Sequence, residues 1–152
     1  MKQHRLTAFV IVAAVAGVGL TACLQQQKSA APATMTFKAH LTGKDEVPPT
    51  GSAGTGDGTV VLNTATNEIT WNVTFSGLTG PAIAAHIHGP GAPGANAGVL
   101  VGFDPPKAPA GEIKGSNVIL AKQVADLKAG KWYVNIHTAA NKGGEIRGQL
   151  MP

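Results

Sequence analysis

The feature that most constrains the fold is a two-residue alternation of apolar and polar side chains, repeated in short runs between glycine- and proline-rich segments. It is clearest over residues 69–76, where Ile69, Trp71, Val73 and Phe75 alternate with polar residues. Such an alternation places one face of a β-strand in a core and the other in polar surroundings. The sequence therefore predicts a domain built largely of β-strands.

Similar runs and the turn-rich segments between them indicate the architecture. We expect strands near residues 35–42, 60–62, 69–76, 82–88, 99–103, 118–120, 132–136 and 146–150. Loops are expected at residues 42–58, 77–81, 89–98 and 104–111, where glycine and proline are dense. One short helix is expected over residues 121–130, ending at Gly130. The predicted fold is all-β: an antiparallel β-sandwich or barrel of seven or eight short strands with one short helix.

The N-terminus predicts export and attachment to a membrane. Lys2 and Arg5 precede an apolar run over residues 8–20, whose last residue begins the sequence Leu20-Thr21-Ala22-Cys23. A basic start, a short apolar stretch and small residues before a cleavage point are typical of a secretory signal. With a cysteine at that point, the segment resembles a bacterial lipoprotein signal, which implies cleavage before Cys23 and lipid on that residue. A plain signal peptide and a transmembrane anchor are the alternatives, although a spanning helix needs about 20 apolar residues.

This interpretation divides the chain into a lipoprotein signal peptide (1–22), a flexible tether (23–34) and a domain (35–152). The expected location is the cell envelope, outside the cytoplasm, with the membrane as a partner through the lipid on Cys23. In a Gram-negative cell the expected place is the periplasm and outer membrane, because Leu24 rather than aspartate follows the cysteine, which resembles the signal of outer-membrane lipoproteins. In other cells it means the extracellular face.

Composition excludes several classes of protein. Cys23 is the only cysteine, so the domain has no internal disulfide and no cysteine-based zinc or iron–sulfur site. Loss of Lys2 and Arg5 with the signal lowers the formal net charge from +4 to about +2. The remaining basic residues are scattered and form no stripe with aromatic residues, which argues against nucleic-acid binding.

Four histidines of the domain are the candidate ligands of a metal ion. His86 and His88 alternate with core residues of one expected strand, so their side chains point the same way, about 7 Å apart at the backbone. His137 and His40 lie on the polar faces of other strands, His137 as a ligand and His40 as an optional one. An all-nitrogen site favours Cu(II) or Zn(II) as the cofactor. The alternative is a set of solvated histidines without metal.

The C-terminal hairpin offers partners for this site. Symmetric pairing would place Glu145 opposite His137 and Arg147 opposite Asn135. A carboxylate beside an imidazole orients it and fixes its tautomer, so Glu145 is expected as an outer partner of the site or as a fourth ligand. Arg147 and Asn135 are expected as further outer partners. The alternative is an ordinary cross-strand pair. Tyr133 shares the polar face with His137 and is expected to face solvent, with a place near the site as the alternative. Trp71 and Trp132 continue apolar stripes and are expected in the core.

Five blocks of sequence resemble the CHRD domain, the module named after chordin. They are FKAHLTGKDEVPP (37–49), WNVTFSGLTGP (71–81), AAHIHGPGAPGANAGVLV (84–101), LKAGKWYVNIHT (127–138) and GGEIRGQL (143–150). The resemblance implies a β-rich extracellular domain and carries no well-defined activity. His86, His88, His137, Glu145 and Arg147 match positions typical of the family, whereas His40 does not.

Two functions from different classes compete. The first is a metal-binding lipoprotein that stores or delivers copper or zinc or gives redox protection. The second is a non-catalytic envelope module, in which structural histidines hold a long loop and the segments 42–58 and 89–98 contact a protein or glycan. Enzymatic activity is poorly supported, since there is no Gly-x-Ser-x-Gly motif. The His-x-His pair is similar to that of copper–zinc superoxide dismutase, but residues 89–98 lack its acidic and histidine ligands.

Overall fold

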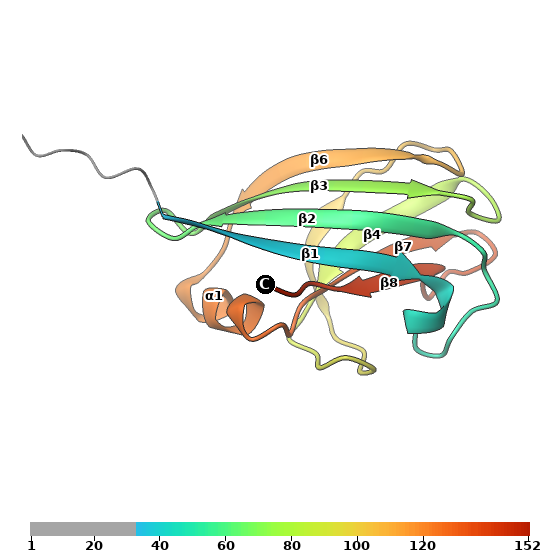
Figure 1. Ribbon diagram of the computed structural model, residues 1–152. Helices are drawn as coiled ribbons and strands as arrows, with labels where there is room; N and C mark the ends of the chain where they lie inside the picture. The colour runs from blue at the N-terminus through green and yellow to red at the C-terminus, as the bar shows by residue number, and fades with distance from the viewer. Residues whose placement is uncertain (1–32) are drawn as a thin grey trace, which may run out of the picture.

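Eight antiparallel strands curl into a nearly closed barrel (Figure 1). The computed structural model describes residues 33–152. The strands are β1 (Thr34–Thr42), β2 (Thr55–Asn63), β3 (Glu68–Ser76), β4 (Ala82–His88), β5 (Val99–Phe103), β6 (Gly111–Val118), β7 (Tyr133–Thr138) and β8 (Ile146–Gln149). A 3-10 turn, η1 (Gly43–Asp45), follows β1, and a helix, α1 (Ala121–Lys128), precedes β7. The predicted all-β fold with one short helix is confirmed.

The order of the strands brings the two ends of the sheet together. Neighbours follow the order β5-β4-β7-β8-β1-β2-β3-β6, and every pairing is antiparallel. The rings of Trp71 on β3 and Phe103 on β5 stack across the seam, with centroids 4.7 Å apart. A sheet that closes in this way leaves little free edge for pairing with another chain.

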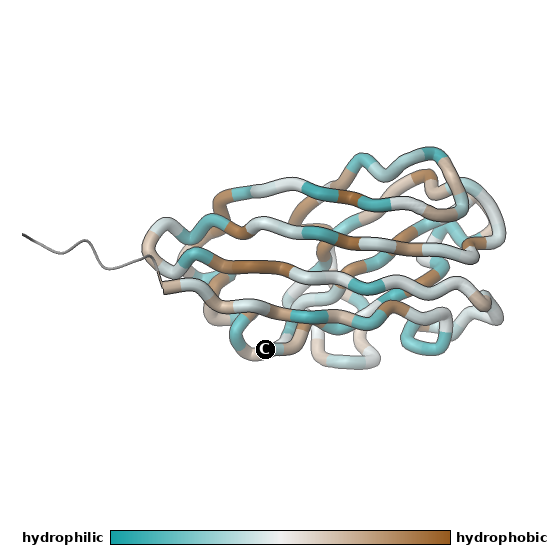
Figure 2. Tube along the Cα trace, turned by 45° about the horizontal axis from the view of Figure 1, so that its top comes forward, coloured by the Kyte–Doolittle hydropathy of each residue, from teal (hydrophilic) through white to brown (hydrophobic). Residues whose placement is uncertain are grey.

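Apolar residues of the alternating runs fill the interior. Phe37, Leu41, Val73 and Ile136 are fully buried, and hydrophobic and hydrophilic positions alternate along the strands in Figure 2. Trp132 is in the core as predicted, whereas Trp71 is half-buried at the seam. Helix α1 lies at one end of the barrel and contributes Leu127 to the core (Figure 1). It stops where predicted, because Gly130 adopts a φ of +67°.

The prediction of a loop over residues 42–58 is wrong at its end, because β2 already begins at Thr55. Residues 55–58 pair with β1 on one side and β3 on the other. Gly56 and Gly58 occupy the inward positions, and a Cβ at Gly58 would contact Ala39, Val73 and Val134. The alternation is present here, but its buried members are glycines, so hydropathy does not reveal it.

Strand β6 was also missed over most of its length. It begins at Gly111, and Ile113 is its only buried apolar residue. At Gly115 the ring of Trp71 occupies the space that a side chain would need. Trp71 of β3 therefore covers this part of β6, so the apolar side chain that would indicate a strand lies in β3 and not in β6 itself.

One residue of β4 lies on the other side from its expected position. Ile83 was expected in the core with Ala85 and Ile87, but it is 44% exposed, whereas Ala82 is buried. The register between β4 and β7 shifts between Ala82 and Ala84. A β-bulge exchanges the two faces of a strand, so the alternation before it no longer predicts the same side.

The signal peptide, most of the tether and Cys23 lie outside the described residues. Thr34, the last residue assigned to the tether, is the first residue of β1. Among residues 33–152, no helix has the length and apolar character needed to cross a membrane.

Candidate metal centre

Three histidines meet on the face of the β4–β7–β8 sheet that points away from the core. His86 and His88 come from β4 and His137 from β7. The register pairs His86 with Asn135, His88 with Tyr133 and Ala84 with His137. Side chains on one face of neighbouring strands lie within contact distance, so this register brings the three imidazoles together. The expected orientation of the three histidines, opposite the core residues, matches the structure.

One ligand atom from each of the three rings can meet at a common point. These atoms all lie within 4.8 Å of one another. His86 Nδ1 is 2.9 Å from His137 Nε2, and the ring centroids of His86 and His88 are 5.3 Å apart. Nitrogen ligands of a tetrahedral zinc ion are separated by about 3.3 Å, given metal–nitrogen bonds of about 2.0–2.1 Å. Small side-chain rotations would therefore bring the three nitrogens into bonding distance of one ion.

Backbone carbonyls set the tautomers of two of the rings. The Nδ1 of His88 donates to Ala97 O and that of His137 to Lys142 O, each over 3.0 Å. A carbonyl oxygen only accepts, so the proton of each neutral ring is on Nδ1 and the lone pair is on Nε2. His86 Nδ1 then donates to His137 Nε2. The Nε2 of His88 is buried and has no hydrogen-bond partner among the described residues.

The surroundings keep these imidazoles neutral. Burial lowers the pKa of His86, His88 and His137 below the usual value. Repulsion among the rings lowers the pKa of His86 and His137 further, and Arg147 does the same for His88. The hydrogen bonds to Ala97 and Lys142 oppose the shift. A neutral imidazole is the form that binds a metal ion.

These histidines are less exposed than the sequence indicated. His88 and His137 are only 9% and 8% exposed. Residues 89–98 fold back over β7 and β8 and bond His88 through Ala97 O, whereas the turn after β7 bonds His137 through Lys142 O. Arg147 holds the segment 89–98 by donating to Ala95 O and to Asn96 Oδ1. The strand pattern predicted the face on which the histidines lie, but it contains no information on what covers that face.

Tyr133 is a site residue whose environment was predicted wrongly. It was expected to face solvent, but it is 2% exposed. Its ring stacks on His88 with an interplanar angle of 1°, and Arg147 Cζ lies 3.5 Å from its centroid. Its hydroxyl accepts a hydrogen bond from Ala97 N. Tyr133 therefore orients His88 and supports the covering segment.

Glu145 does not contact the histidines. Its carboxylate accepts hydrogen bonds from Ser52, Thr79, Thr138 and Asn141. Burial by itself raises the pKa of Glu145, but the hydrogen bonds from Thr138, Ser52 and Thr79 lower it to about 2. The carboxylate joins four segments at one end of the barrel, and His137 is oriented by a backbone carbonyl instead.

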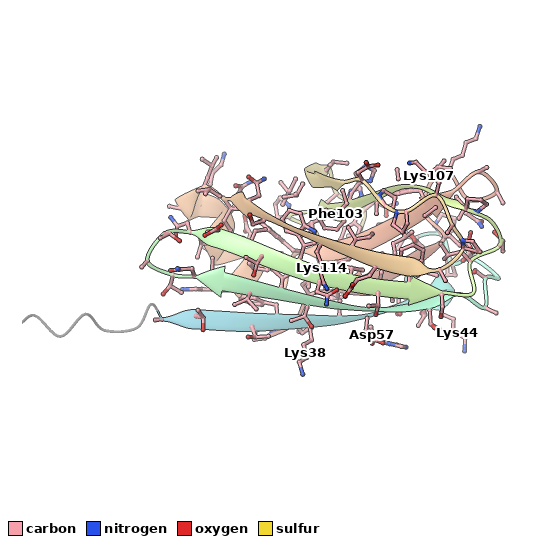
Figure 3. The ribbon with its side chains drawn as sticks, turned by 90° about the horizontal axis from the view of Figure 1, so that it is seen from above. Lys38, Lys44, Asp57, Phe103, Lys107 and Lys114 are labelled. Atoms are coloured by element: carbon pink, nitrogen blue, oxygen red, sulfur yellow. The ribbon has the colours of Figure 1, made fainter. Side chains whose placement is uncertain are left out.

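The other predicted residues lie in different places. Asn135 pairs with Arg147 in the predicted register, and its amide donates to Glu46 Oε2 over 3.3 Å. His40 is exposed on β1 and contacts Asp57, which projects from the outer side of the β1–β2 wall in Figure 3. The structure therefore brings His86, His88 and His137 together and leaves His40 apart. Glu46, a buried acid beside Asn135, was not identified from the sequence because it lies in a segment expected to be an exposed loop.

Comparison with known proteins places the chain in a family. A family model described as the CHRD domain matches residues 37–150. The match spans all eight strands except the first residues of β1, and it includes the three histidines. No significant match was found among curated proteins or among solved structures. The chain belongs to the CHRD domain family.

Proposed function

We propose that this CHRD domain binds one transition-metal ion, copper or zinc, through His86, His88 and His137. The observation that carries the proposal is the convergence of three neutral imidazoles, two of which have their Nδ1 protons committed to backbone carbonyls. The Nε2 lone pair of His88 is thereby available to an ion, and that of His137 becomes available when an ion replaces the hydrogen bond from His86 Nδ1. The buried Nε2 of His88 lacks a partner among residues 33–152, and an ion would supply one.

The donor set favours particular ions. Three imidazoles without a thiolate suit Cu(II) and Zn(II), whereas calcium and magnesium require oxygen ligands. Storage, delivery or redox protection are functions that such a site supports. An ion bound here would lie beneath the segment 89–98, which restricts access from solvent.

Metal titration of the purified protein tests the proposal. The wild-type chain should bind about one Zn(II) or Cu(II) per molecule, and a ligand at about 100 times its Kd should stabilise the fold by about 2.7 kcal/mol. His86→Ala with His88→Ala should abolish both effects. His40→Ala is the matched control and should behave as wild type, because His40 lies on another surface. Equal binding by the wild type and the double variant would refute the site.

A structural role for the histidines is the second candidate, and one observation favours it. His88 already bonds the segment 89–98 through Ala97 O, as a loop-holding histidine would. Under this hypothesis His88→Ala destabilises the fold while added metal stabilises neither protein. Crosslinking at the cell surface would then identify a protein or glycan partner.

We also propose that Cys23 carries lipid and anchors the domain to the outer side of a membrane in the cell envelope. The lipoprotein-like signal before Cys23 supports this, and the 11 residues 23–33 would link the lipid to β1. Cys23→Ser should move the protein from the membrane fraction to the soluble fraction. Mass spectrometry of the N-terminal peptide should show acyl chains on the wild type alone.

A further inference from the structure

Glu46 is a buried acid that the three histidines do not contact. It is 4% exposed and follows η1 directly. Together with residues 47–51 and 140–144 it lines a cavity of about 390 Å³. A carboxyl group so deeply buried is neutral unless a nearby cation or several hydrogen bonds, as at Glu145, stabilise its charge.

Glu46 and Asn135 face each other with only half of their hydrogen bonds made. Asn135 Nδ2 donates to Glu46 Oε2. Glu46 Oε1 and Asn135 Oδ1 are both buried, and within residues 33–152 neither has a partner. A proton on Oε1, donated to Asn135 Oδ1, would satisfy both atoms at once. The result is the two-bond ring that a carboxylic acid forms with an amide.

Gly144 shows how closely the two groups approach. Its φ of +136° lies in the region that favours glycine, and its backbone covers the pair. A Cβ added there would come within 2.5 Å of both amide atoms of Asn135 and would overlap Glu46 Oε1. Both side chains therefore pack against one point of the backbone, where a larger residue would separate them.

We propose that Glu46 is a neutral carboxylic acid paired reciprocally with Asn135, and that it loses its proton to compensate charge when the histidine site binds a metal ion. The second half of this inference rests on the proposed function. Asn135 lies between His86 on β4 and Arg147 on β8 in one row of the sheet. A cation held by His86 would favour the ionised form of Glu46, because only the side chain of Asn135 separates the two residues.

The electrostatic surroundings support a proton that is easily released near neutral pH. Burial raises the pKa of Glu46 to about 7, against the opposing influence of Arg147 and of hydrogen bonds from Val47 and Asn135. The charged or titratable groups that face Glu46 or its cavity are Asp45 on its own segment, Arg147 on β8 and Lys142 in the turn before β8. His86 and His137 lie on the same face of the sheet, and burial keeps both neutral.

The metal-free protein tests the acid–amide pair. The chain has four glutamates, and carbon-13 NMR resolves the titration of each side-chain carboxyl. One carboxyl signal should titrate near pH 7 and be absent from the spectrum of Glu46→Gln. The signal of Glu145 should titrate at about pH 2 and serve as an internal reference. The glutamine of that variant keeps both hydrogen bonds, because its amide donates to Asn135 Oδ1. A Glu46 carboxyl that is already ionised at pH 6 would overturn the pair, and the wild-type spectrum alone decides this.

Zinc affinity at two pH values tests the link to the histidines. At pH 6 Glu46 is protonated, so wild type and Glu46→Gln should bind zinc equally. At pH 8 the wild type should bind zinc several-fold to about tenfold more tightly than Glu46→Gln, since a coupling of one pKa unit is a tenfold change in affinity. Glu112→Gln, the same change at an exposed residue of β6, should match wild type at both values.

The outcomes separate this inference from the proposed function. A ratio of affinities that does not change with pH overturns the charge-compensating role and leaves the metal site intact. Absence of zinc binding by the wild type refutes the metal site and that role together. In either case the NMR titration still decides whether Glu46 and Asn135 form an acid–amide pair.

Discussion

Replacing Glu145 with glutamine should weaken the fold rather than the histidine cluster. Its two carboxylate oxygens accept five hydrogen bonds, from Ser52 Oγ, Thr79 N, Thr79 Oγ1, Thr138 Oγ1 and Asn141 Nδ2. A glutamine keeps one acceptor oxygen and turns an NH₂ group toward donors. The backbone N–H of Thr79 cannot rotate away, so at least one contact becomes repulsive or is lost.

The magnitude follows from the pKa of Glu145. A carboxyl whose pKa falls from 4.5 to about 2 on folding contributes about 3 kcal/mol at neutral pH. Because the folded value is the lower one, this stabilisation is complete above the unfolded pKa and is lost as pH falls toward 2. Loss of one or two charge-assisted hydrogen bonds, at about 1.5–3 kcal/mol each, gives a similar figure. We therefore expect Glu145→Gln to cost about 3 kcal/mol at pH 7.

Urea denaturation followed by tryptophan fluorescence measures this difference. The gap in unfolding free energy between wild type and Glu145→Gln should be about 2 kcal/mol smaller at pH 3 than at pH 7. Glu112→Gln, at an exposed salt bridge with Lys114, is the control and should show no gap of that size. A Glu145→Gln protein as stable as wild type at pH 7, or a gap that does not shrink in acid, would refute the reasoning. If Glu145→Gln bound metal more weakly at unchanged stability, Glu145 would be a partner of His137 in the metal site.

Two further predictions concern the segment that covers the site, and a third concerns the histidines. Tyr133→Phe removes the hydroxyl that bonds Ala97 N, and should cost about 1 kcal/mol and speed hydrogen exchange of that amide, measured by NMR. Arg147→Gln removes the cation that holds Ala95 O, and should make the segment 89–98 susceptible to proteolysis while the barrel stays folded. In Glu46→Gln, where residue 46 no longer titrates, zinc affinity should hold through pH 6.5, the usual imidazole pKa, and fall only at lower pH, since burial lowers the pKa of all three histidines. An affinity of this variant that already falls between pH 7.5 and 6.5 would contradict those shifts.

Strand pairing was predictable only where the buried residues are apolar. The run Ile69–Phe75 identified β3, but β2 and β6 were partly missed because Gly58 and Gly115 occupy positions covered by neighbouring strands. Period-two alternation also fails at a bulge, which is why Ile83 is exposed. In each case the missing information is the side chain contributed by another strand.

The candidate site shows the same division. The register of β7 and β8 was predicted correctly for Asn135 and Arg147. Glu145, by contrast, lies before β8 begins and after Gly144, whose positive φ turns the chain. Strand geometry no longer sets the direction of its side chain there, and hydroxyl donors from distant segments determine it.

The amino-acid sequence by itself determined that the chain forms antiparallel strands and that His86, His88 and His137 share the face opposite the core. Alternation is a property of the local backbone, so it can be inferred from neighbouring residues. Tertiary structure decided that this face is covered by residues 89–98, which carbonyls set the tautomers, and that Glu46 meets Asn135. Those outcomes depend on hydrogen bonds and burial between segments far apart in the chain, which no local pattern specifies.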